Sequence, residues 1–507
     1  MEFIAANMAP LMFGSLVIFL LFGYPVAFAL AANGVVFGLI GIELGLLTPA
    51  LFQALPDRIF GVMSNDTLLA IPFFTFMGLI LERSGMAEDL LDTIGQLFGP
   101  VRGGLAFAVI FVGAILAATT GVVAASVISM GLISLPIMMR YGYDQRLATG
   151  VIAASGTLAQ IIPPSLVLII MADQLGRSVG DMYQGAMIPG LVLTGLYVGY
   201  VALVAVFKPA AAPALPLEAR TLRGGKLFLR VLTTLVPPLM LIFLVLGTIF
   251  LGIATPTEGG AMGAAGALVM AILRGRLNVS LLKQAMETTA KLTTFVVFIL
   301  VGARVFSLTF YGVEGHLWVE HLLTGLPGGQ LGFLIVVNIL IFLLAFFLDF
   351  FELSFIVVPL LAPVAEKLGI DLIWFGVLLG VNMQTSFMHP PFGFALFYLR
   401  SVAPPSIKTT QIYWGAVPFV IIQIIMVGII ITFPQLVTMG LDKQEKVDTD
   451  SIEIVVPDGE APEDSPVQFD APQEGEGKPA GDGAEVPPPA EDDAAKALEK
   501  ALQQDKK

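Results

Sequence analysis

Glycines and prolines recur along this chain at a constant spacing, and this is the feature that most limits how it can fold. The pair Pro163-Pro164 returns as Pro390-Pro391, 227 residues later. The same offset, without a gap, links Gly85 to Gly312, Pro100 to Pro327, Pro136 to Pro363, Gly142 to Gly369 and Asp144 to Asp371. Gly and Pro determine turns and helix breaks. We therefore interpret the coincidence as two copies of one structural unit, with chance matching as the alternative.

Long apolar segments place these copies in a membrane. Hydrophobic residues make up 56% of the chain and charged residues only 13%. Several apolar runs approach or exceed the roughly 18 residues that mark a candidate membrane-spanning helix, such as Leu11–Leu30, Leu191–Phe207, Leu235–Leu251 and Val417–Phe433. The first ten residues contain no Lys or Arg and so do not resemble a signal peptide. We predict an all-α integral membrane protein whose first span is retained.

Counting segments leads to a topology. Each half contains seven apolar segments, but two inverted halves need an odd number of crossings each, so we predict one re-entrant helical hairpin per half. The hairpins are expected at about 102–139 and 329–366. The crossings are then expected near 9–31, 33–47, 67–83, 147–173 and 185–207, and near 231–252, 256–273, 292–310, 372–400 and 412–436. The first inverted repeat would cover 1–207 and the second 231–436.

Basic residues orient this arrangement. The loop 208–230 contains five Lys or Arg residues against the single Glu218, and we place it in the cytoplasm by the positive-inside rule. Only Arg58, Arg177 and Lys367 then fall on the opposite side, and Arg304 falls within a span. Both termini become periplasmic, and the two hairpins enter from opposite faces. The amphipathic segments 84–99 and 274–291 are predicted to lie along the cytoplasmic interface.

The C-terminal segment differs from the rest. Residues 441–507 contain 19 acidic and 7 basic residues and are rich in Pro, Gly and Ala. Such a segment cannot bury enough apolar surface to fold alone, so we predict a disordered acidic tail, with a docking segment as the alternative. The chain has no Cys, which excludes disulfides and thiolate chemistry.

The two Pro-Pro breaks fall within the predicted spans 147–173 and 372–400. Unwound backbone at membrane depth is tolerated where it is buried or lines a cavity, and its carbonyls can bind Na⁺. Small polar residues precede each break: Ser155, Gly156, Thr157 and Gln160 before Pro163-Pro164, and Asn382, Gln384, Thr385 and Ser386 before Pro390-Pro391. We interpret these as a binding site; the alternative is that they only permit close helix packing.

Three ionisable residues lie close to these features. Asp349 and Glu352 fall at the second hairpin tip, where a carboxylate either serves a cation or proton or caps the following helix. His389 precedes Pro390-Pro391 and either contacts substrate or packs as a neutral ring. We expect no transition-metal site, because His316, Glu320 and His321 have no further ligand in view. The chain has no Gly-rich phosphate loop, so we expect no ATP hydrolysis and no enzyme.

Several motifs together resemble the large membrane subunit of TRAP transporters (tripartite ATP-independent periplasmic transporters). They are GYPVAFAL, LLAIPFFTFMGLILERSGMAEDLL, ASGTLAQIIPPSLVLI, ATPTEGGAMGA and QTSFMHPPFGFALFYLR. The resemblance covers about residues 10–436. The PPFGFALFYLRSVAP form is most similar to the subgroup labelled mannitol/chloroaromatic-compound type.

The resemblance implies an elevator-type permease of the ion transporter superfamily in the bacterial inner membrane. Its implied partners are a small four-span membrane subunit (DctQ-like) and a periplasmic substrate-binding protein, and its implied work is Na⁺-driven import of an organic acid without a cofactor. The implied Na⁺ ligands lie at Thr119, Thr120, Gly121, Ser155, Gly156, Thr157, Asp349, Gln384, Thr385 and Ser386. From the residues at the breaks and the second tip, we expect the substrate path to include Gln160, Pro163, Pro164, Glu352, Asn382, His389, Pro390 and Pro391. The chain departs from the family at the first tip, where ATTGVVAAS replaces a Ser-rich stretch.

Other functions remain open from the residues alone. A stand-alone Na⁺- or H⁺-coupled dicarboxylate carrier of the same superfamily is the nearest alternative. An intramembrane enzyme would need a catalytic pair of Ser and His or of two Asp residues. An open channel fits inverted hairpins less well than gated access does.

Overall fold

A computed structural model describes residues 2–120, 123–346, 348–391 and 393–441, but not the side chains of Thr119 and Thr120. Within these ranges the regular structure is helical, without strands. Seven helices of the described part are long and apolar enough to cross a membrane, or up to nine if each of two bent pairs forms one span. The predicted all-α membrane class is confirmed. Residues 442–507, with nearly all of the predicted tail, lie outside the described residues.

The first half of the chain contains eleven α-helices in the described residues. They are α1 (Glu2–Ala6), α2 (Met8–Leu21), α3 (Val26–Glu43), α4 (Leu55–Met63), α5 (Ala70–Arg83), α6 (Met86–Phe98), α7 (Gly104–Thr120), α8 (Val123–Arg140), α9 (Gln145–Thr157), α10 (Leu166–Leu175) and α11 (Val179–Phe207). Short 3₁₀ turns, η1 (Pro49–Ala54), η2 (Asp66–Leu69) and η3 (Leu158–Gln160), separate some of them. Two more, η4 (Pro209–Ala211) and η5 (Leu217–Ala219), lie in the loop 208–230.

The second half follows the same order. Its helices are α12 (Gly224–Phe250), α13 (Pro256–Leu273), α14 (Val279–Gly312), α15 (Gly315–Thr324), α16 (Gly329–Leu344), α17 (Phe350–Glu352), α18 (Val358–Lys367), α19 (Leu372–Gln384), α20 (Phe394–Val402), α21 (Thr409–Thr432) and α22 (Gln435–Thr438). The π-helical stretch η6 (Leu353–Val357) joins α17 to α18, and the 3₁₀ turn η7 (Thr385–Phe387) follows α19.

Element boundaries reproduce the offset seen in the sequence. Helix α9 and turn η3 cover residues 145–160, and 227 residues later α19 and η7 cover 372–387. Equivalent aspartates begin the two helices: the Asp144 side chain accepts hydrogen bonds from backbone N–H groups of the first turn, and so does Asp371. The peptide bond within each Pro-Pro pair is cis. These element boundaries therefore repeat at the offset, while the two inverted repeats stay a prediction.

Two predicted boundaries are wrong. The expected crossings 9–31 and 33–47 are divided instead at residues 22–25, between α2 and α3. Gly23 takes a left-handed φ of 79° there, and Pro25 precedes α3 with no N–H to donate, so the first helix cannot continue. The expected arm 274–291 is not separate from the span 292–310. Residues 279–312 form one helix of 34 residues, since no proline interrupts them.

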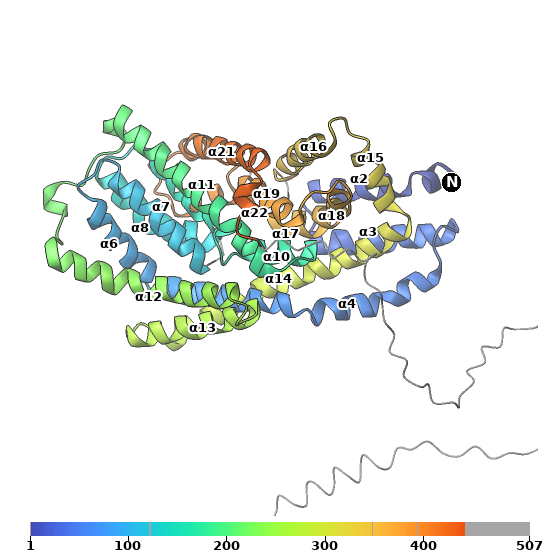
Figure 1. The fold of residues 1–507 in the computed structure, drawn as a ribbon, viewed down its shortest axis with the longest axis horizontal. Helices are drawn as coiled ribbons and strands as arrows, with labels where there is room; N and C mark the ends of the chain where they lie inside the picture. The colour runs from blue at the N-terminus through green and yellow to red at the C-terminus, as the bar shows by residue number, and fades with distance from the viewer. Residues whose placement is uncertain (1, 121–122, 347, 392, 442–507) are drawn as a thin grey trace, which may run out of the picture. The chain divides into compact units, whose positions relative to one another are not determined.

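Helices of the two halves surround a shared centre. Figure 1 shows α7 and α8 on one side, α16 and α18 on the other, and α10, α17 and α19 between them. Helices α7 and α8 pack against each other and against α9, and α16 packs against α19. Helix α5 lies along α13, and α14 lies along α3. The interrupted elements are thus enclosed by helices from both halves.

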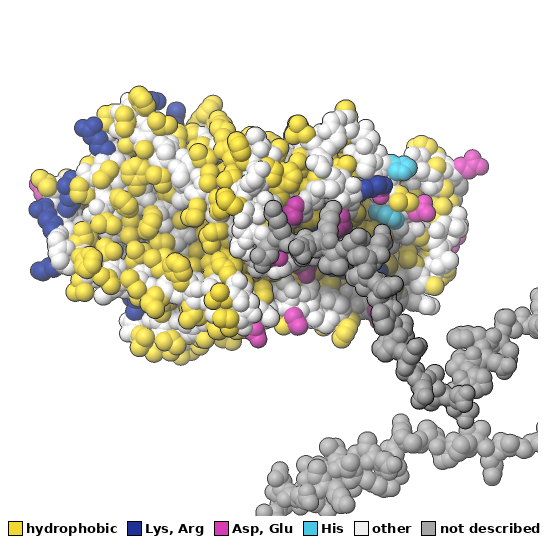
Figure 2. Space-filling view, viewed as in Figure 1, with side chains coloured by type: hydrophobic (Ala, Val, Ile, Leu, Met, Phe, Trp, Pro, Cys, Tyr) yellow, Lys and Arg dark blue, Asp and Glu magenta, His cyan; other side chains and the backbone are white. Residues whose placement is uncertain are grey.

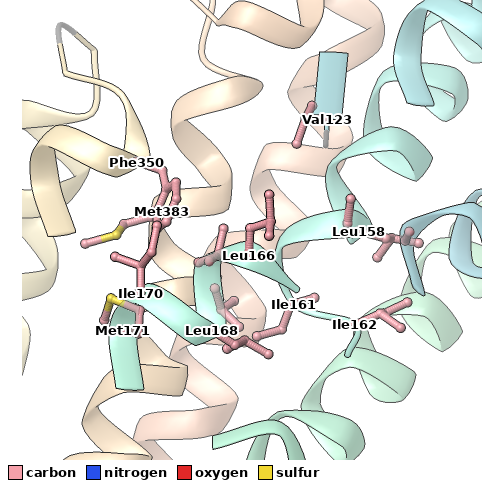
Figure 3. Close-up of a cluster of buried hydrophobic side chains, with 14 of the residues drawn as sticks. Val123, Leu158, Ile161, Ile162, Leu166, Leu168, Ile170, Met171, Phe350 and Met383 are labelled. Atoms are coloured by element: carbon pink, nitrogen blue, oxygen red, sulfur yellow. The ribbon is translucent and has the colours of Figure 1, made fainter. Parts of the chain in front are cut away.

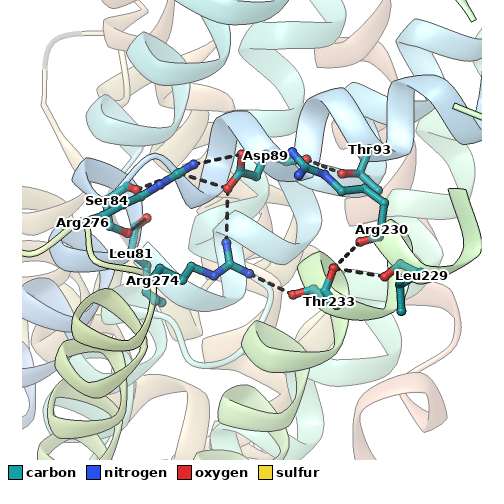
Figure 4. A network of polar contacts seen from close by, with 9 residues as sticks. All are labelled: Leu81, Ser84, Asp89, Thr93, Leu229, Arg230, Thr233, Arg274 and Arg276. Carbon is teal, nitrogen blue, oxygen red and sulfur yellow. Dashed lines mark hydrogen bonds and ion pairs between the residues drawn. The ribbon is translucent and has the colours of Figure 1, made fainter. Parts of the chain in front are cut away.

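Charged side chains separate along the molecule. On the face that Figure 2 shows, most Lys and Arg lie at the end where α6 and the start of α12 lie in Figure 1, whereas His and most Asp and Glu lie from the middle toward the end that holds α2 and α15. At the basic end the Asp89 carboxylate of α6 pairs with three arginines (Figure 4): Arg230 at 3.4 Å, Arg274 at 3.3 Å and Arg276 at 3.0 Å. This carboxylate joins α6 to α12 and to the end of α13.

Candidate functional site

The first break is an interrupted helix whose ends are held by side chains. Helix α9 ends at Thr157, whose hydroxyl donates to the Ala154 carbonyl oxygen at 2.8 Å. After η3 and the prolines, α10 begins at Leu166. The Ser165 hydroxyl donates to the Gln160 carbonyl oxygen at 2.5 Å and so satisfies one carbonyl that the break releases from helical bonding.

The second break has the same construction. Helix α19 ends at Gln384, and the hydroxyl of Thr385 donates to the Asn382 carbonyl oxygen at 2.6 Å. The chain then passes through η7 and Pro390-Pro391 before α20 begins at Phe394. Proline cannot donate a backbone hydrogen bond and clashes with the preceding turn, which accounts for both interruptions.

The two breaks meet through their side chains. The Gln384 amide donates to the Thr157 hydroxyl oxygen with an Nε2–Oγ1 distance of 3.1 Å. Both side chains are fully buried, as are their neighbours Ser155 and Thr385. The polar residues that the sequence places in two separate clusters therefore form one buried site with contributions from both halves.

Four oxygen atoms on the polar residues before the two breaks have no hydrogen-bond partner within the described ranges. They are Ser155 Oγ, Gln160 Oε1, Gln384 Oε1 and Ser386 Oγ, each on a residue at most 1% exposed. A buried oxygen without a partner costs free energy, so native proteins rarely leave several together unless another group binds there. Hydroxyl and amide oxygens are hard ligands that suit an alkali cation better than a transition metal. The residues present therefore fit Na⁺.

Close packing fixes the first break against the predicted hairpin of α7 and α8. A methyl group on Gly113 of α7 would lie 2.6 Å from the Ser155 Cβ, and one on Gly156 would lie 2.3 Å from a methyl carbon of Val127 on α8. Apolar side chains surround the break, as Figure 3 shows for Leu158, Ile161, Ile162, Leu166, Leu168, Phe350 and Met383. Pro163 and Pro164 are also buried. The polar atoms thus lie in a largely apolar shell.

Asp349 and Glu352 form a reciprocal cap at the start of α17. The Asp349 carboxylate accepts from the Glu352 N–H at 3.0 Å, and the Glu352 carboxylate accepts from the Asp349 N–H at 3.0 Å. Of the two roles considered for Asp349, helix capping is the one this geometry contains. Asp349 also lines a cavity of about 310 Å³ together with Gln160, Phe387 and Tyr398, here called the central cavity. Glu352 lines a separate cavity of about 630 Å³ with Tyr24.

His389 is held between two aromatic rings. Its ring centroid lies 4.3 Å from that of Phe346, which stacks on it, and 4.2 Å from that of Phe342, which meets it edge-on. Both ring nitrogens are buried, and neither has a hydrogen-bond partner in the part of the chain that the structure describes. Of the two prolines that follow, Pro390 is half-buried and Pro391 is exposed.

Sequence reasoning missed one polar residue of this region. Asn338 on α16 accepts hydrogen bonds from the Asn382 side-chain amide at its backbone carbonyl, 2.8 Å, and at its own side-chain oxygen, 3.0 Å. Its signal was visible as a lone Asn in the apolar run GFLIVVNILIFLL. It anchors Asn382 to the predicted second hairpin.

The predicted first tip is only partly described. Thr119 and Thr120 end α7, but their side chains lie outside the described set, and so does Gly121 entirely. Their predicted part in Na⁺ binding stays a prediction.

Comparison with known proteins gives consistent results. Residues 13–436 match the family described as tripartite ATP-independent periplasmic transporter, DctM component. The C4-dicarboxylate TRAP transporter large permease protein DctM of Pseudomonas aeruginosa is 31% identical over 401 residues, which cover 78% of this chain and 91% of that protein. The isethionate TRAP transporter permease protein DctMQ of Oleidesulfovibrio alaskensis is 27% identical over 403 residues, covering 79% of this chain and 61% of the relative.

A solved structure shares the fold. The YdaH transporter of Alcanivorax borkumensis superimposes with a TM-score of 0.53 at 17% identity, covering 76% of this chain and 89% of that one. At this identity the likeness concerns the fold alone.

Proposed function

Because the chain belongs to the DctM component of tripartite ATP-independent periplasmic transporters, we propose that it imports an organic acid by using a Na⁺ gradient. It is a multi-pass membrane transporter permease and not an enzyme, as its family and relatives establish. The observation that carries the Na⁺ proposal is the buried contact between Thr157 and Gln384, together with four partnerless oxygens on the polar residues before the two breaks.

Na⁺ would bind at these oxygens and complete their coordination. The donor set consists of Ser155, Gln160, Gln384 and Ser386, together with carbonyl groups freed by the breaks. Because the breaks belong to different repeats, an ion bound there would hold α9 and α19 together. Gln160 belongs to the proposed ion donor set and also lines the central cavity. Na⁺ binding and organic-acid binding would therefore be coupled if the acid binds in the central cavity only after the ion has fixed the position of Gln160.

The substrate class is proposed from the relatives and from the site. The two relatives described above are named for C4-dicarboxylate and isethionate, both small organic anions. The central cavity, of about 310 Å³, has room for a molecule of this size. The predicted subgroup label, mannitol/chloroaromatic, stays a prediction and carries no substrate assignment.

We propose two partner proteins and an orientation. The match covers 61% of the DctMQ relative, which leaves more than a third of that longer chain for a further component. A small four-span subunit and a periplasmic binding protein would therefore act with this chain in the bacterial inner membrane. The basic end (Figure 2) would face the cytoplasm, with both termini in the periplasm. The elevator motion would carry the hairpins and broken helices between the two faces.

Reconstitution with and without partners tests this function. The permease is placed in liposomes alone, with the small subunit, and with both the small subunit and the binding protein, and uptake of a panel of organic acids is followed. Uptake that requires all components supports the tripartite importer. Uptake by the permease alone at a similar rate would favour the stand-alone dicarboxylate carrier.

A further inference from the structure

A second cavity, distinct from the central one, is lined by two arginines. It has a volume of about 350 Å³, and Arg58 of α4 and Arg304 of α14 contribute to its wall together with Gln174, Ser307 and Tyr311. The topology predicted from the sequence places Arg304 within a span. A charged residue at that depth is costly and normally has a partner or a functional role. The cavity is called the arginine cavity below.

Within the residues that the structure describes, no hydrogen bond or ion pair joins Arg58 or Arg304 to an acidic side chain. Asp173, which precedes the cavity-lining Gln174 in the sequence, accepts from the Asn65 and Gln174 amides at 2.6 and 2.7 Å, and Glu366 pairs with Arg177. Two positive charges around one cavity, with no acid of their own, attract a ligand that carries two negative charges.

The polar groups of the wall suit a carboxylate. A guanidinium presents several N–H donors in a planar fork that matches the two oxygens of a carboxylate. Ser307 lies on α14 three residues after Arg304 and adds a hydroxyl on the same helical face. Tyr311 follows at the next turn, with its hydroxyl near the Pro359 carbonyl oxygen, 3.4 Å away. The remainder of the wall includes apolar residues such as Leu300 and Phe355, which would contact the carbon chain of an acid.

Its place in the fold connects it with the central cavity. Phe295, which lines the central cavity, and Leu300, which lines the arginine cavity, are five residues apart on α14, about 7.5 Å along the helix axis. Phe350 and Phe355 connect the same two cavities along the start of the second hairpin's outgoing arm. Arg58 belongs to α4 and Arg304 belongs to α14. Gln174 and Phe355 belong instead to α10 and η6, which would move in the proposed elevator motion.

The geometry points to the arginine cavity as a docking site for a dicarboxylate, occupied before the acid passes to the central cavity. This inference rests on the proposed import function and names its substrate class. Arg58 and Arg304 hold the acid from the stationary side, and Gln174 contacts it from the moving side. Movement of α10 and η6 then carries the acid away from the arginines.

The absence of Cys allows a direct test on the full chain. Ser307→Cys places a single thiol in the cavity of the permease in lipid nanodiscs, and its reaction with a negatively charged methanethiosulfonate is timed without Na⁺. Succinate is expected to slow the reaction. Its half-protecting concentration should rise about tenfold when Arg304→Gln or Arg58→Gln removes a charge-assisted hydrogen bond. Arg304→Lys keeps the positive charge but not the planar guanidinium fork, so its half-protecting concentration should lie between those of the wild type and Arg304→Gln.

Matched controls separate the arginine cavity from general surface charge. Arg102→Gln removes an exposed arginine that does not line the arginine cavity, and it should leave succinate protection unchanged. Butyrate, with one carboxylate, should protect about tenfold less well than succinate if both charges are used. The anionic reagent should also react faster than a cationic analogue at this thiol, and Arg304→Gln should narrow that difference.

The outcomes distinguish this inference from the import function. Equal protection by succinate in wild type and in both glutamine variants overturns the docking site, as does an absence of protection in wild type. Butyrate as effective as succinate overturns the dicarboxylate assignment. If protection depends on the arginines but the reconstituted system shows no Na⁺-driven uptake, the docking site is supported and the proposed function is contradicted.

Discussion

The Gln384 amide nitrogen lies 3.1 Å from the Thr157 hydroxyl oxygen, and these residues occupy equivalent positions 227 apart in the two repeats. The last residue of α9 thus contacts the last residue of α19. A hydrogen bond between repeat-equivalent residues places the two helix breaks at one point. It explains how two clusters that are distant in the sequence can form one ion site.

Removing the Thr157 hydroxyl should harm both stability and Na⁺ use. In Thr157→Val the Gln384 amide stays buried without its partner, at a cost of about 1–3 kcal/mol in the free energy of unfolding. We also expect the Na⁺ concentration for half-maximal uptake to rise, and likewise for Thr385→Val. Thermal unfolding and Na⁺ titration of uptake measure the two effects.

Thr194→Val is the control for that experiment. The Thr194 hydroxyl donates to the Gly190 carbonyl oxygen of its own helix, at 2.8 Å, and not to either cluster of polar residues before the breaks. Thr194→Val should leave the Na⁺ dependence of uptake unchanged. If Thr157→Val and Thr385→Val also leave Na⁺ activation unchanged, these residues do not support the ion site.

Gly150 should tolerate no side chain, because α9 and α21 touch there through their backbones. A methyl group at Gly150 would lie 2.1 Å from the Gly415 carbonyl oxygen. Gly150→Ala must therefore push α21 away, and we expect a loss of about 1–3 kcal/mol or more in stability. Gly195→Ala on α11 meets nothing within 4 Å and should be neutral or slightly stabilising. Unfolding of both variants in the same detergent is the comparison, and equal stability would contradict the close contact.

The Asp89 carboxylate should be needed to hold α6 in place. In Asp89→Asn the three arginines around it (Figure 4) lose their shared counter-charge and repel one another. The carboxylate is partly exposed, so we expect a loss of about 1–2 kcal/mol. Asp92→Asn removes an exposed acid of the same helix and serves as the control. If both variants unfold at the same temperature and protease cleaves near α6 equally slowly in each, the Asp89 carboxylate does not hold α6 in place.

Much of the fold was predictable because Gly and Pro residues determine where many of its helices begin, end or break. The Pro-Pro pairs predicted that the spans 147–173 and 372–400 are interrupted, as they are after α9 and α19, and the element boundaries repeat at the offset of the sequence. The break at Gly23 and Pro25 was misplaced because apolar residues continue across it. The continuous α14 was divided because amphipathic and apolar stretches can share one helix when no breaker separates them.

The site was predictable in its parts but not in its contacts. Periodicity and spacing indicated which polar residues lie at the breaks. They could not indicate that Gln384 would meet Thr157, that Asn338 would hold Asn382, or that Arg58 and Arg304 would line one cavity. Such pairs depend on how helices far apart in the sequence pack together.

The hairpin topology predicts opposite changes in accessibility at the two tips. Single cysteines at Thr119 and Asp349, in a chain with no other Cys, should alternate in their exposure as the transporter is driven by Na⁺ and substrate. A membrane-impermeant thiol reagent applied from one face measures the change. If both positions react from the same face throughout the cycle, the two hairpins do not enter from opposite sides.

The central claim is that a Na⁺ gradient drives organic-acid import through this permease. The most direct measurement is the initial rate of radiolabelled organic-acid uptake into liposomes that contain the permease, its small subunit and the binding protein, with and without an inward Na⁺ gradient. With the gradient, the acid should accumulate above its outside concentration, and this accumulation should collapse when a sodium ionophore is added. Equal accumulation without Na⁺, or accumulation driven by a proton gradient alone, would contradict it.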